Sequence, residues 1–274
     1  MVGVVGCIVA ELRNTTTPIA IDVAISNYQA TATTDPVGAG STTSPTTVLA
    51  PASPSSVLVT PSSAAPLSRT AVQRLVAPGV YRMTTSGQES IDVLGGATHL
   101  YPAETALVVR PSGCGVRVEW TPLQERTEWW EMCLVDGGIA IVRTGGIHEF
   151  FGQRDERSVE CPDRAWLVPP PEQSAETWQH TCEGSGLVDV RTVSIAEPTN
   201  VTIDGRTVVA LRIDTAVSTT GDSESATTRS LVLTEDGLPL SWSDNVLGTS
   251  DTAAGSVTYR ETFEMELVST APAT

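Results

Sequence analysis

The chain has 274 residues, of which 40% are apolar, and this is enough to close a hydrophobic core. All 16 cationic side chains are arginines, and 32 carboxylates outnumber them to give a formal charge of −16. A surface of this sign repels phosphate. We therefore expect no nucleic-acid partner and no polybasic contact with anionic lipid.

Residues 1–10 are apolar and uncharged, but they are too few to span a bilayer, and no arginine precedes them as a signal peptide requires. Val4 to Cys7 has the form of a bacterial lipobox, which predicts lipidation of Cys7. The apolar run continues from Ile8 to Ala10, which fits the last turns of a truncated transmembrane helix instead. Both interpretations predict a membrane anchor, and a buried strand is the third alternative.

Residues 11–77 are predicted to be a linker. From Gln29 to Ala77 the composition shifts to Ser, Thr, Pro and Ala, without a periodic apolar face. Such a chain cannot form a core and stays extended and semi-stiff. We expect a disordered spacer that holds the following domain away from a membrane or carries it through a cell wall.

Residues 78–274 are predicted to be all β. Runs of β-forming residues alternate with turn signals, and tight hairpins favour a glycine because it adopts positive φ. Four dipeptides between such runs are the candidate turns: Ser86-Gly87, Asp136-Gly137, Asp204-Gly205 and Asp236-Gly237. Successive hairpins predict an antiparallel meander that forms a curved sheet or half-barrel, with a β-sandwich as the alternative.

Four cysteines fall inside this domain, whereas Cys7 stands apart: Cys114, Cys133, Cys161 and Cys182. An even set suggests two disulfides and an oxidising compartment. The alternative is a four-thiolate zinc site, which usually has close CxxC pairs, and here no two of the four are closer than 19 positions. We therefore expect an extracytoplasmic, membrane- or cell-wall-associated protein.

The spacing of these cysteines predicts local pairing. Cys114 and Cys133 lie symmetrically about a turn at positions 123–124, and Cys161 and Cys182 about one at 171–172. Each pair would then face across its own hairpin. In the first hairpin this register also sets Val118 opposite Trp129.

The last predicted strand, Gly255 to Val268, has one apolar face. Alternation places these residues on it: Val257, Tyr259, Phe263, Met265 and Leu267. The same period points Glu261 inward, where it either pairs with an arginine at the sheet's rim or acts on a ligand. We expect Tyr259, Glu261, Phe263 and Met265 to bind a ligand, with Val209, Leu211 and Ile213 forming a second apolar row.

The Asp204-Gly205 hairpin, the segment Leu233-Thr234-Glu235-Asp236-Gly237-Leu238-Pro239-Leu240 and the long closing strand resemble the half-barrel of LolA and LppX-type lipoprotein carriers. The resemblance covers about Leu187 to Val268. It implies a strongly curved antiparallel sheet around an apolar cavity, with a lipid or other apolar small molecule as the partner. The first half, with Gly79-Val80-Tyr81, is similar to an uncharacterised group of secreted or anchored actinobacterial proteins, which implies no activity.

Catalytic motifs are not evident. His148-Glu149 begins like HExxH, but residue 152 is Gly, so no second histidine follows one helical turn later. Ser185, between two glycines, is typical of a turn and not of a nucleophile elbow. We expect no cofactor, no metal and no catalytic residue.

The sequence favours an envelope-tethered binding module that carries or senses an apolar ligand and touches the membrane through its anchor only. The alternative is a secreted hydrolase whose site is built from dispersed Asp, Glu and His. The sheet's interior discriminates between them. A continuous apolar lining favours carriage, whereas inward carboxylates clustered around Glu261 favour chemistry.

Overall fold

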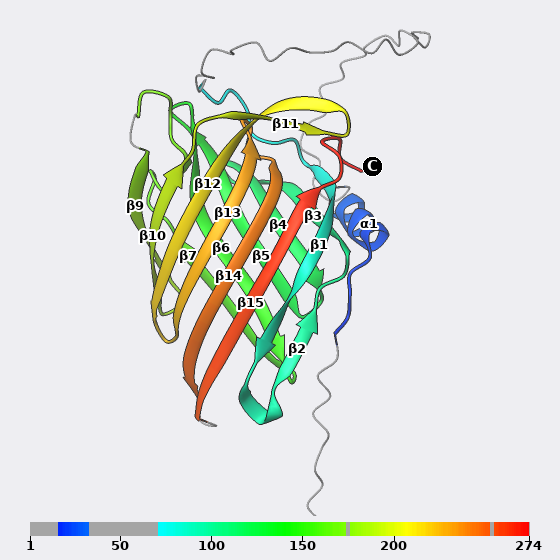
Figure 1. Cartoon of the computed structure of the whole chain (residues 1–274), viewed down its shortest axis with the longest axis vertical. Helices are drawn as coiled ribbons and strands as arrows, with labels where there is room; N and C mark the ends of the chain where they lie inside the picture. The colour runs from blue at the N-terminus through cyan, green and yellow to red at the C-terminus, as the bar shows by residue number, and fades with distance from the viewer. Residues whose placement is uncertain (1–15, 33–70, 174–175, 253–254, 274) are drawn as a thin grey trace, which may run out of the picture.

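The computed structural model describes residues 16–32, 71–173, 176–252 and 255–273. Within these ranges one helix, one short 3₁₀ turn and fifteen strands follow in chain order (Figure 1). They are α1 (Ile21–Ala32), β1 (Gly79–Ile91), η1 (Val93–Gly95), β2 (Ala97–Leu100), β3 (Glu104–Ser112), β4 (Gly115–Leu123), β5 (Arg126–Val135), β6 (Gly138–Phe150), β7 (Gln153–Glu160), β8 (Trp166–Val168), β9 (Thr177–Gly184), β10 (Leu187–Ile195), β11 (Thr199–Ile203), β12 (Arg206–Gly221), β13 (Glu224–Thr234), β14 (Pro239–Thr252) and β15 (Gly255–Leu267).

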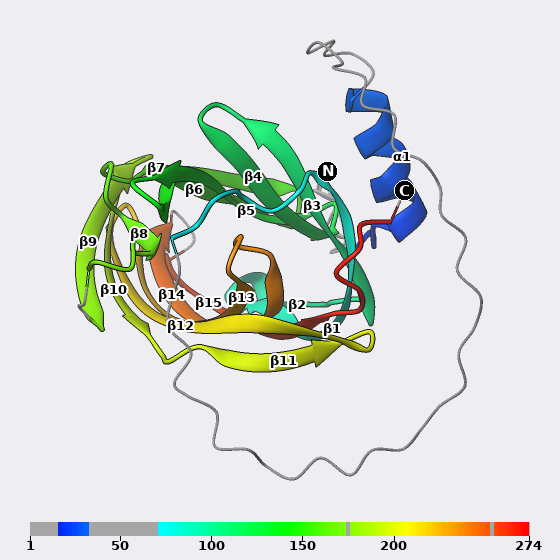
Figure 2. The same cartoon turned by 90° about the horizontal axis from the view of Figure 1, so that it is seen from above.

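The strands form one antiparallel sheet that closes into a ring. Neighbours follow the order β10-β9-β7-β6-β5-β4-β3-β1-β15-β14-β13-β12, and β10 also pairs with β12. Figure 2 looks into this ring, with β11, β2 and β8 attached to β12, β1 and β6. The predicted all-β antiparallel meander and curved sheet are confirmed. A single sheet wraps around the interior, so the apolar rows are covered by the opposite wall.

Three of the four predicted turns connect strands as expected. Residues 136–137, 204–205 and 236–237 join β5 to β6, β11 to β12 and β13 to β14. The prediction at Gly87 is wrong, because Gly87 lies inside β1 and faces Phe263 of β15. A Cβ on Gly87 would lie 2.3 Å from the carbonyl oxygen of Thr262. Glycine is needed here for close strand approach, and not for a turn.

Part of each predicted apolar row lies in the core of one half of the ring, whereas Val209 is half-buried and Val257 and Tyr259 line a pocket at one end. Leu211 and Ile213 of β12 belong to the same buried cluster as Phe263 and Met265 of β15. The Phe263 ring lies 4.4 Å from that of Trp120, between ring centroids. Buried side chains therefore fill this half of the interior.

Residues 71–77, here called the strap, cross one end of the ring (Figure 2). The amide of Val72 donates to the carbonyl of Gly137 at 2.8 Å, and that of Val76 donates to Asp236 at 2.7 Å. Both valines are buried in the core. The packed region thus includes the last residues of the range that the sequence assigns to the linker.

Helix α1 packs on the outer face of β1 and β3. Ala24 contacts the cluster of Val80, Ala106 and Val108, with Ile19, Ile25 and Tyr28 beside it. This helix also falls within residues 11–77. No helix in the described ranges has the length and apolarity needed to cross a membrane.

Both predicted disulfides are confirmed. Cys114 is bonded to Cys133, and Cys161 is bonded to Cys182. The register of the first hairpin differs from expectation by one residue, because Val118 faces Trp130 across β4 and β5. An irregularity between Trp120 and Leu123 shifts the pairing. The prediction assumed a symmetric hairpin without such an irregularity.

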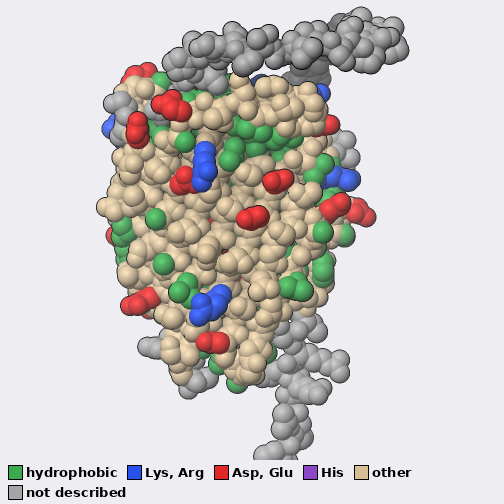
Figure 3. Space-filling view, viewed as in Figure 1, with side chains coloured by type: hydrophobic (Ala, Val, Ile, Leu, Met, Phe, Trp, Pro, Cys, Tyr) green, Lys and Arg blue, Asp and Glu red, His purple; other side chains and the backbone are tan. Residues whose placement is uncertain are grey.

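The outer face of β13 to β15 is polar and largely uncharged (Figure 3). A broad groove on it is lined by Thr228, Ser230, Ser243, Asn245 and Thr262, among others. On the same three strands Arg229, Asp244 and Glu261 point into the ring. There Arg229 pairs with Asp244 and Glu128, and Glu261 pairs with Arg126. These strands therefore place charges in the interior, where unpaired charges are costly.

Candidate functional site

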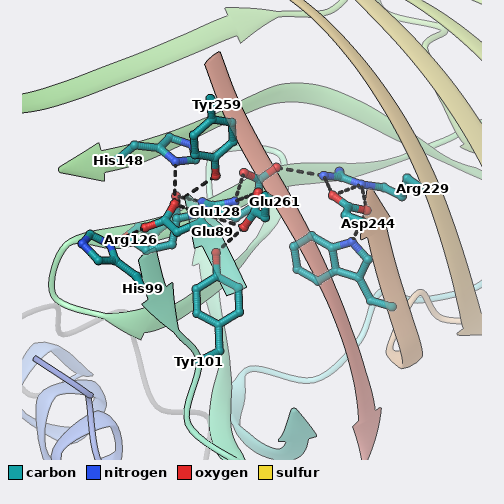
Figure 4. A network of polar contacts seen from close by, with 12 residues as sticks. Glu89, His99, Tyr101, Arg126, Glu128, His148, Arg229, Asp244, Tyr259 and Glu261 are labelled. Carbon is teal, nitrogen blue, oxygen red and sulfur yellow. Dashed lines mark hydrogen bonds and ion pairs between the residues drawn. The ribbon is translucent and has the colours of Figure 1, made fainter. Parts of the chain in front are cut away.

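A network of charged and polar side chains occupies the interior beyond the apolar core (Figure 4). Its members come from seven strands and from the first residue of the loop between β2 and β3. They are Glu89, His99, Tyr101, Arg126, Glu128, His148, Arg229, Asp244, Tyr259 and Glu261. We call this set the charged network.

Glu261 points into the ring, as alternation predicts, and only 2% of its surface is exposed. Arg126 donates to it twice, from Nε to Oε1 and from Nη2 to Oε2, both at 3.0 Å. The hydroxyl of Tyr101 donates to Oε1 at 2.5 Å. Glu261 therefore has the arginine partner that the sequence suggested, deep in the interior and not at a rim. Such a forked pair is geometrically specific as well as strong.

Glu89 is fully buried and has four polar neighbours. Its carboxylate lies 2.8 Å from Nδ1 of His99 and 3.1 Å from Nδ1 of His148. The hydroxyl of Tyr259 donates to it at 2.9 Å, and Nε of Arg126 lies 3.7 Å away. Burial raises the pKa of Glu89, but the two histidine hydrogen bonds and the arginine charge outweigh it and lower the pKa to about 2.

His148 is oriented by this carboxylate. Burial lowers the pKa of His148, and the charge of Arg126 lowers it further, so the imidazole is neutral at neutral pH. Nε2 lies 3.4 Å from Nη2 of Arg157, and a guanidinium can only donate. We therefore assign the proton to Nδ1, which donates to Glu89, and the lone pair to Nε2.

A second arm runs from Glu128 to Asp244. Glu128 accepts from Arg126 at 3.2 Å and from Arg229 at 3.0 Å. Arg229 also bonds Asp244 at 2.6 Å, and the indole of Trp242 donates to Asp244 at 2.7 Å. Burial raises the pKa of Glu128, but the two arginines outweigh it and lower the pKa to about 2. Each carboxylate of the network thus lies beside an arginine. The arginines hold Glu128 ionised, whereas burial outweighs the charge of Arg229 at Asp244 and raises the pKa of Asp244 to about 6.

A pocket opens at the end of the ring opposite the strap, and we call it the end pocket. Its volume is about 470 Å³. Its apolar lining includes Ile91, Leu94, Phe150, Phe151, Val246 and Val257. His148 and Tyr259, which both bond Glu89, also line it, together with three charged residues, Asp155, Arg157 and Glu224. Apolar walls with a few oriented polar groups are the usual composition of a small-molecule site.

The predicted ligand-binding residues are divided by the structure. Tyr259 lines the end pocket, and Glu261 lies in the charged network, two residues along the same strand. Phe263 and Met265 are 2% and 1% exposed and belong to the packed core. Only the start of β15 therefore reaches the pocket. Cys7, the predicted lipidation site, lies outside the described residues.

Sequence reasoning missed His148, Phe150 and Leu94 as pocket residues. His148 and Phe150 alternate on β6, which is a usable signal for a shared face. The sequence does not show that this face of β6 lies opposite Tyr259 across the ring. The ring centroids of His148 and Tyr259 are 5.0 Å apart.

A further group, Cys161, His180 and Cys182, has potential metal-ligating atoms within 4.8 Å of one another. Both sulfurs are joined in a disulfide, so neither is a thiolate able to bind a metal.

Comparisons with family models, with curated proteins and with solved structures found no match. The resemblance to LolA-type carriers stays a prediction from sequence, and the geometry of the end pocket is the basis for a function.

Proposed function

We propose that this chain is an extracytoplasmic binding protein, tethered at the cell envelope through residues 1–10, that holds an apolar small molecule in the end pocket. The two disulfides support the compartment, because such bonds persist mainly under oxidising conditions. The tether comes from the sequence pattern around Cys7.

The observation that carries the proposal is the end pocket itself. Its volume of about 470 Å³ falls within the range of roughly 300–1,000 Å³ typical of ligand sites. Phe150, Phe151 and Val257 offer apolar surface, and His148 and Tyr259 offer hydrogen-bonding groups. An apolar ligand would gain free energy by leaving water for these walls.

The charged network supports binding by holding polar groups of the pocket in place. His148 and Tyr259 each bond Glu89, and Glu89 in turn lies beside Arg126. A site whose side chains are already fixed loses less conformational entropy when a ligand enters. The network thus fixes the orientation of two side chains of the pocket before a ligand binds.

A hydrolase is the second candidate, because Glu89 and His148 form an oriented carboxylate–imidazole pair beside a pocket. The contact of Nε2, however, is the cation Arg157 and not a nucleophilic hydroxyl. The carboxylates around Glu261 are already bound by arginines. Hydrolysis of p-nitrophenyl esters that disappears in a His148→Gln variant would favour this candidate over binding.

The test of binding uses Nile red, an uncharged apolar dye whose fluorescence rises in apolar surroundings. Leu94 lines the end pocket and is 64% exposed, whereas Leu100 on β2 is 67% exposed and is not among the pocket's residues. Leu94 has a φ of 55°, which Asp tolerates well, so Leu94→Asp should fold.

We expect saturable dye binding by the wild type. Leu94→Asp should weaken it at least about tenfold, since a carboxylate at an apolar wall opposes entry of the dye. Leu100→Asp is the matched control and should bind like the wild type. Equal binding by all three proteins would place the dye elsewhere and overturn the proposal, as would the absence of dye binding.

A further inference from the structure

A small polar cavity adjoins the end pocket. Its volume is about 80 Å³, and Arg157 and Ser225 line both spaces. Since a water molecule occupies about 30 Å³ in the liquid, the cavity has room for a headgroup of only a few atoms. We call it the inner cavity.

The inner cavity is lined by three arginines and two carboxylates: Arg157, Arg191, Arg229, Glu128 and Asp189. Arg229 is bound to Glu128 at 3.0 Å, and Arg191 is bound to Asp189 at 2.8 Å. Within the described ranges Arg157 forms no ion pair with a carboxylate, and its polar contact is with the neutral His148. Of the three arginines, Arg157 is thus the one without a carboxylate within ion-pair distance among the described residues.

Arg191 has a donor without an acceptor. Its Nη2 donates to Thr144 at 2.7 Å and to Asp189 at 2.8 Å. Arg191 is only 8% exposed, and its Nε is buried without a hydrogen-bond partner among the described residues. A buried donor left unsatisfied costs free energy, so an acceptor entering the cavity would be stabilised there.

We propose that the inner cavity binds the carboxylate of an amphiphilic ligand whose apolar part fills the end pocket. This inference rests on the proposed function and specifies its ligand class. A carboxylate is small, accepts hydrogen bonds only and fits the planar fork of a guanidinium. Arg157 stands at the junction of the two spaces, so it would hold the headgroup while Phe150 and Val257 contact the chain behind it.

The experiment compares two ligands on the wild-type protein, a pyrene-labelled fatty acid and its methyl ester. Both are titrated by fluorescence below their aggregation concentration at pH 7.5. We expect the acid to bind at least about tenfold more tightly, because charge-assisted hydrogen bonds form only with the ionised headgroup. If acid and ester bind equally, this inference is overturned while the end pocket keeps its ligand. If neither binds, the proposed function fails as well.

A pair of variants on β7 locates the effect. Arg157→Gln should weaken binding of the acid more than binding of the ester and so remove most of the preference for the acid, whatever its effect on the shared pocket. Arg154→Gln carries the same charge change on an exposed side chain three residues away and should keep the preference. Loss of the preference in both variants would indicate bulk electrostatics and contradict the assignment. The comparison of the two ligands needs no variant, so it remains decisive even if Arg157→Gln does not fold.

Discussion

Glu89 and Glu261 stand directly opposite each other on the neighbouring strands β1 and β15. Like charges in such a cross-strand pair are destabilising when they are alone. Here Nε of Arg126 lies 3.0 Å from Glu261 and 3.7 Å from Glu89. Arg126 begins β5, which is separated from β1 by two strands in the ring order. One guanidinium therefore reduces the repulsion between the two carboxylates and links two walls of the ring.

Replacing Arg126 should be severely destabilising. Arg126→Met leaves two buried carboxylates without their cation, and breaking a buried pair in this way costs about 3–5 kcal/mol. The control is Arg212→Met, whose pair with Asp214 is 60% and 46% exposed and should contribute less than about 1 kcal/mol. Urea denaturation measures both. Similar small losses in the two variants would contradict a central role for Arg126.

The two disulfides should differ in what their loss exposes. They span 19 and 21 residues, so each contributes about 3 kcal/mol by chain entropy. Among the described residues the β7–β9 ladder consists of the pair Glu160 and Glu183, next to the Cys161–Cys182 bond. That bond therefore holds β7 and β9 together where they share a single residue pair.

Replacing both Cys161 and Cys182 by Ala should raise amide hydrogen exchange locally in β7 and β9. The matched variant, with Cys114 and Cys133 replaced, should leave β4 and β5 protected, because their ladder has further pairs from Val116 to Trp120. Equal increases in amide exchange in both variants would show that the β7–β9 boundary depends no more on its disulfide than the β4–β5 ladder does.

Gly87 should resist even the smallest side chain. It has a φ of 141°, and an added Cβ would lie 2.6 Å from Cα of Phe263. Gly87→Ala must separate β1 from β15, at a cost of roughly 1–3 kcal/mol. Gly205 also has positive φ, but a Cβ there would meet no described atom within 4 Å. Gly205→Ala therefore reports the conformational cost alone, and a loss as large as that of Gly87→Ala would refute the steric argument.

These examples show how far local pattern predicts this fold. Period-2 alternation identified the inward face of β15, including Glu261. Whether a side chain points into or out of the ring depends only on its position along its own strand. The Ser86-Gly87 pair was assigned to a turn because glycine serves both turns and close strand contacts. α1 was missed because Ile19 to Ile25 alternate like a strand, while the helical stripe of Ile21, Ala24 and Tyr28 is short.

The candidate site was less predictable for a related reason. Arg126, His148 and Tyr259 come from strands that are distant in sequence and meet only because the ring closes. Closure depends on the β10–β12 pairing and on how many strands separate the walls, neither of which leaves a local signal. Alternation therefore indicated buried apolar rows, but not which charges would meet inside the ring.

Stability should fall as the solution is acidified from neutral pH. The pKa of His148 is lowered by burial, and burial together with Arg191 lowers that of His180 to about 4. The unfolded chain binds protons at these histidines near pH 6.5, whereas the folded chain does not, so acid favours unfolding below about pH 6.5. Asp244 acts in the opposite direction, because burial raises its pKa to about 6 and so offsets part of this loss.

A second loss should follow at lower pH. Glu89 and Glu128 titrate near pH 4.5 when unfolded but at about 2 in the folded chain. Their ionised forms therefore stabilise the fold above pH 4.5, and this contribution disappears as the pH falls toward 2. Urea denaturation at pH 7.5, 5.5, 4 and 3 should give a steadily lower free energy of unfolding, with a shallower slope between pH 6.5 and 4 for His180→Gln. The same slope between pH 6.5 and 4 in His180→Gln and in the wild type would mean that the fold does not hold His180 neutral.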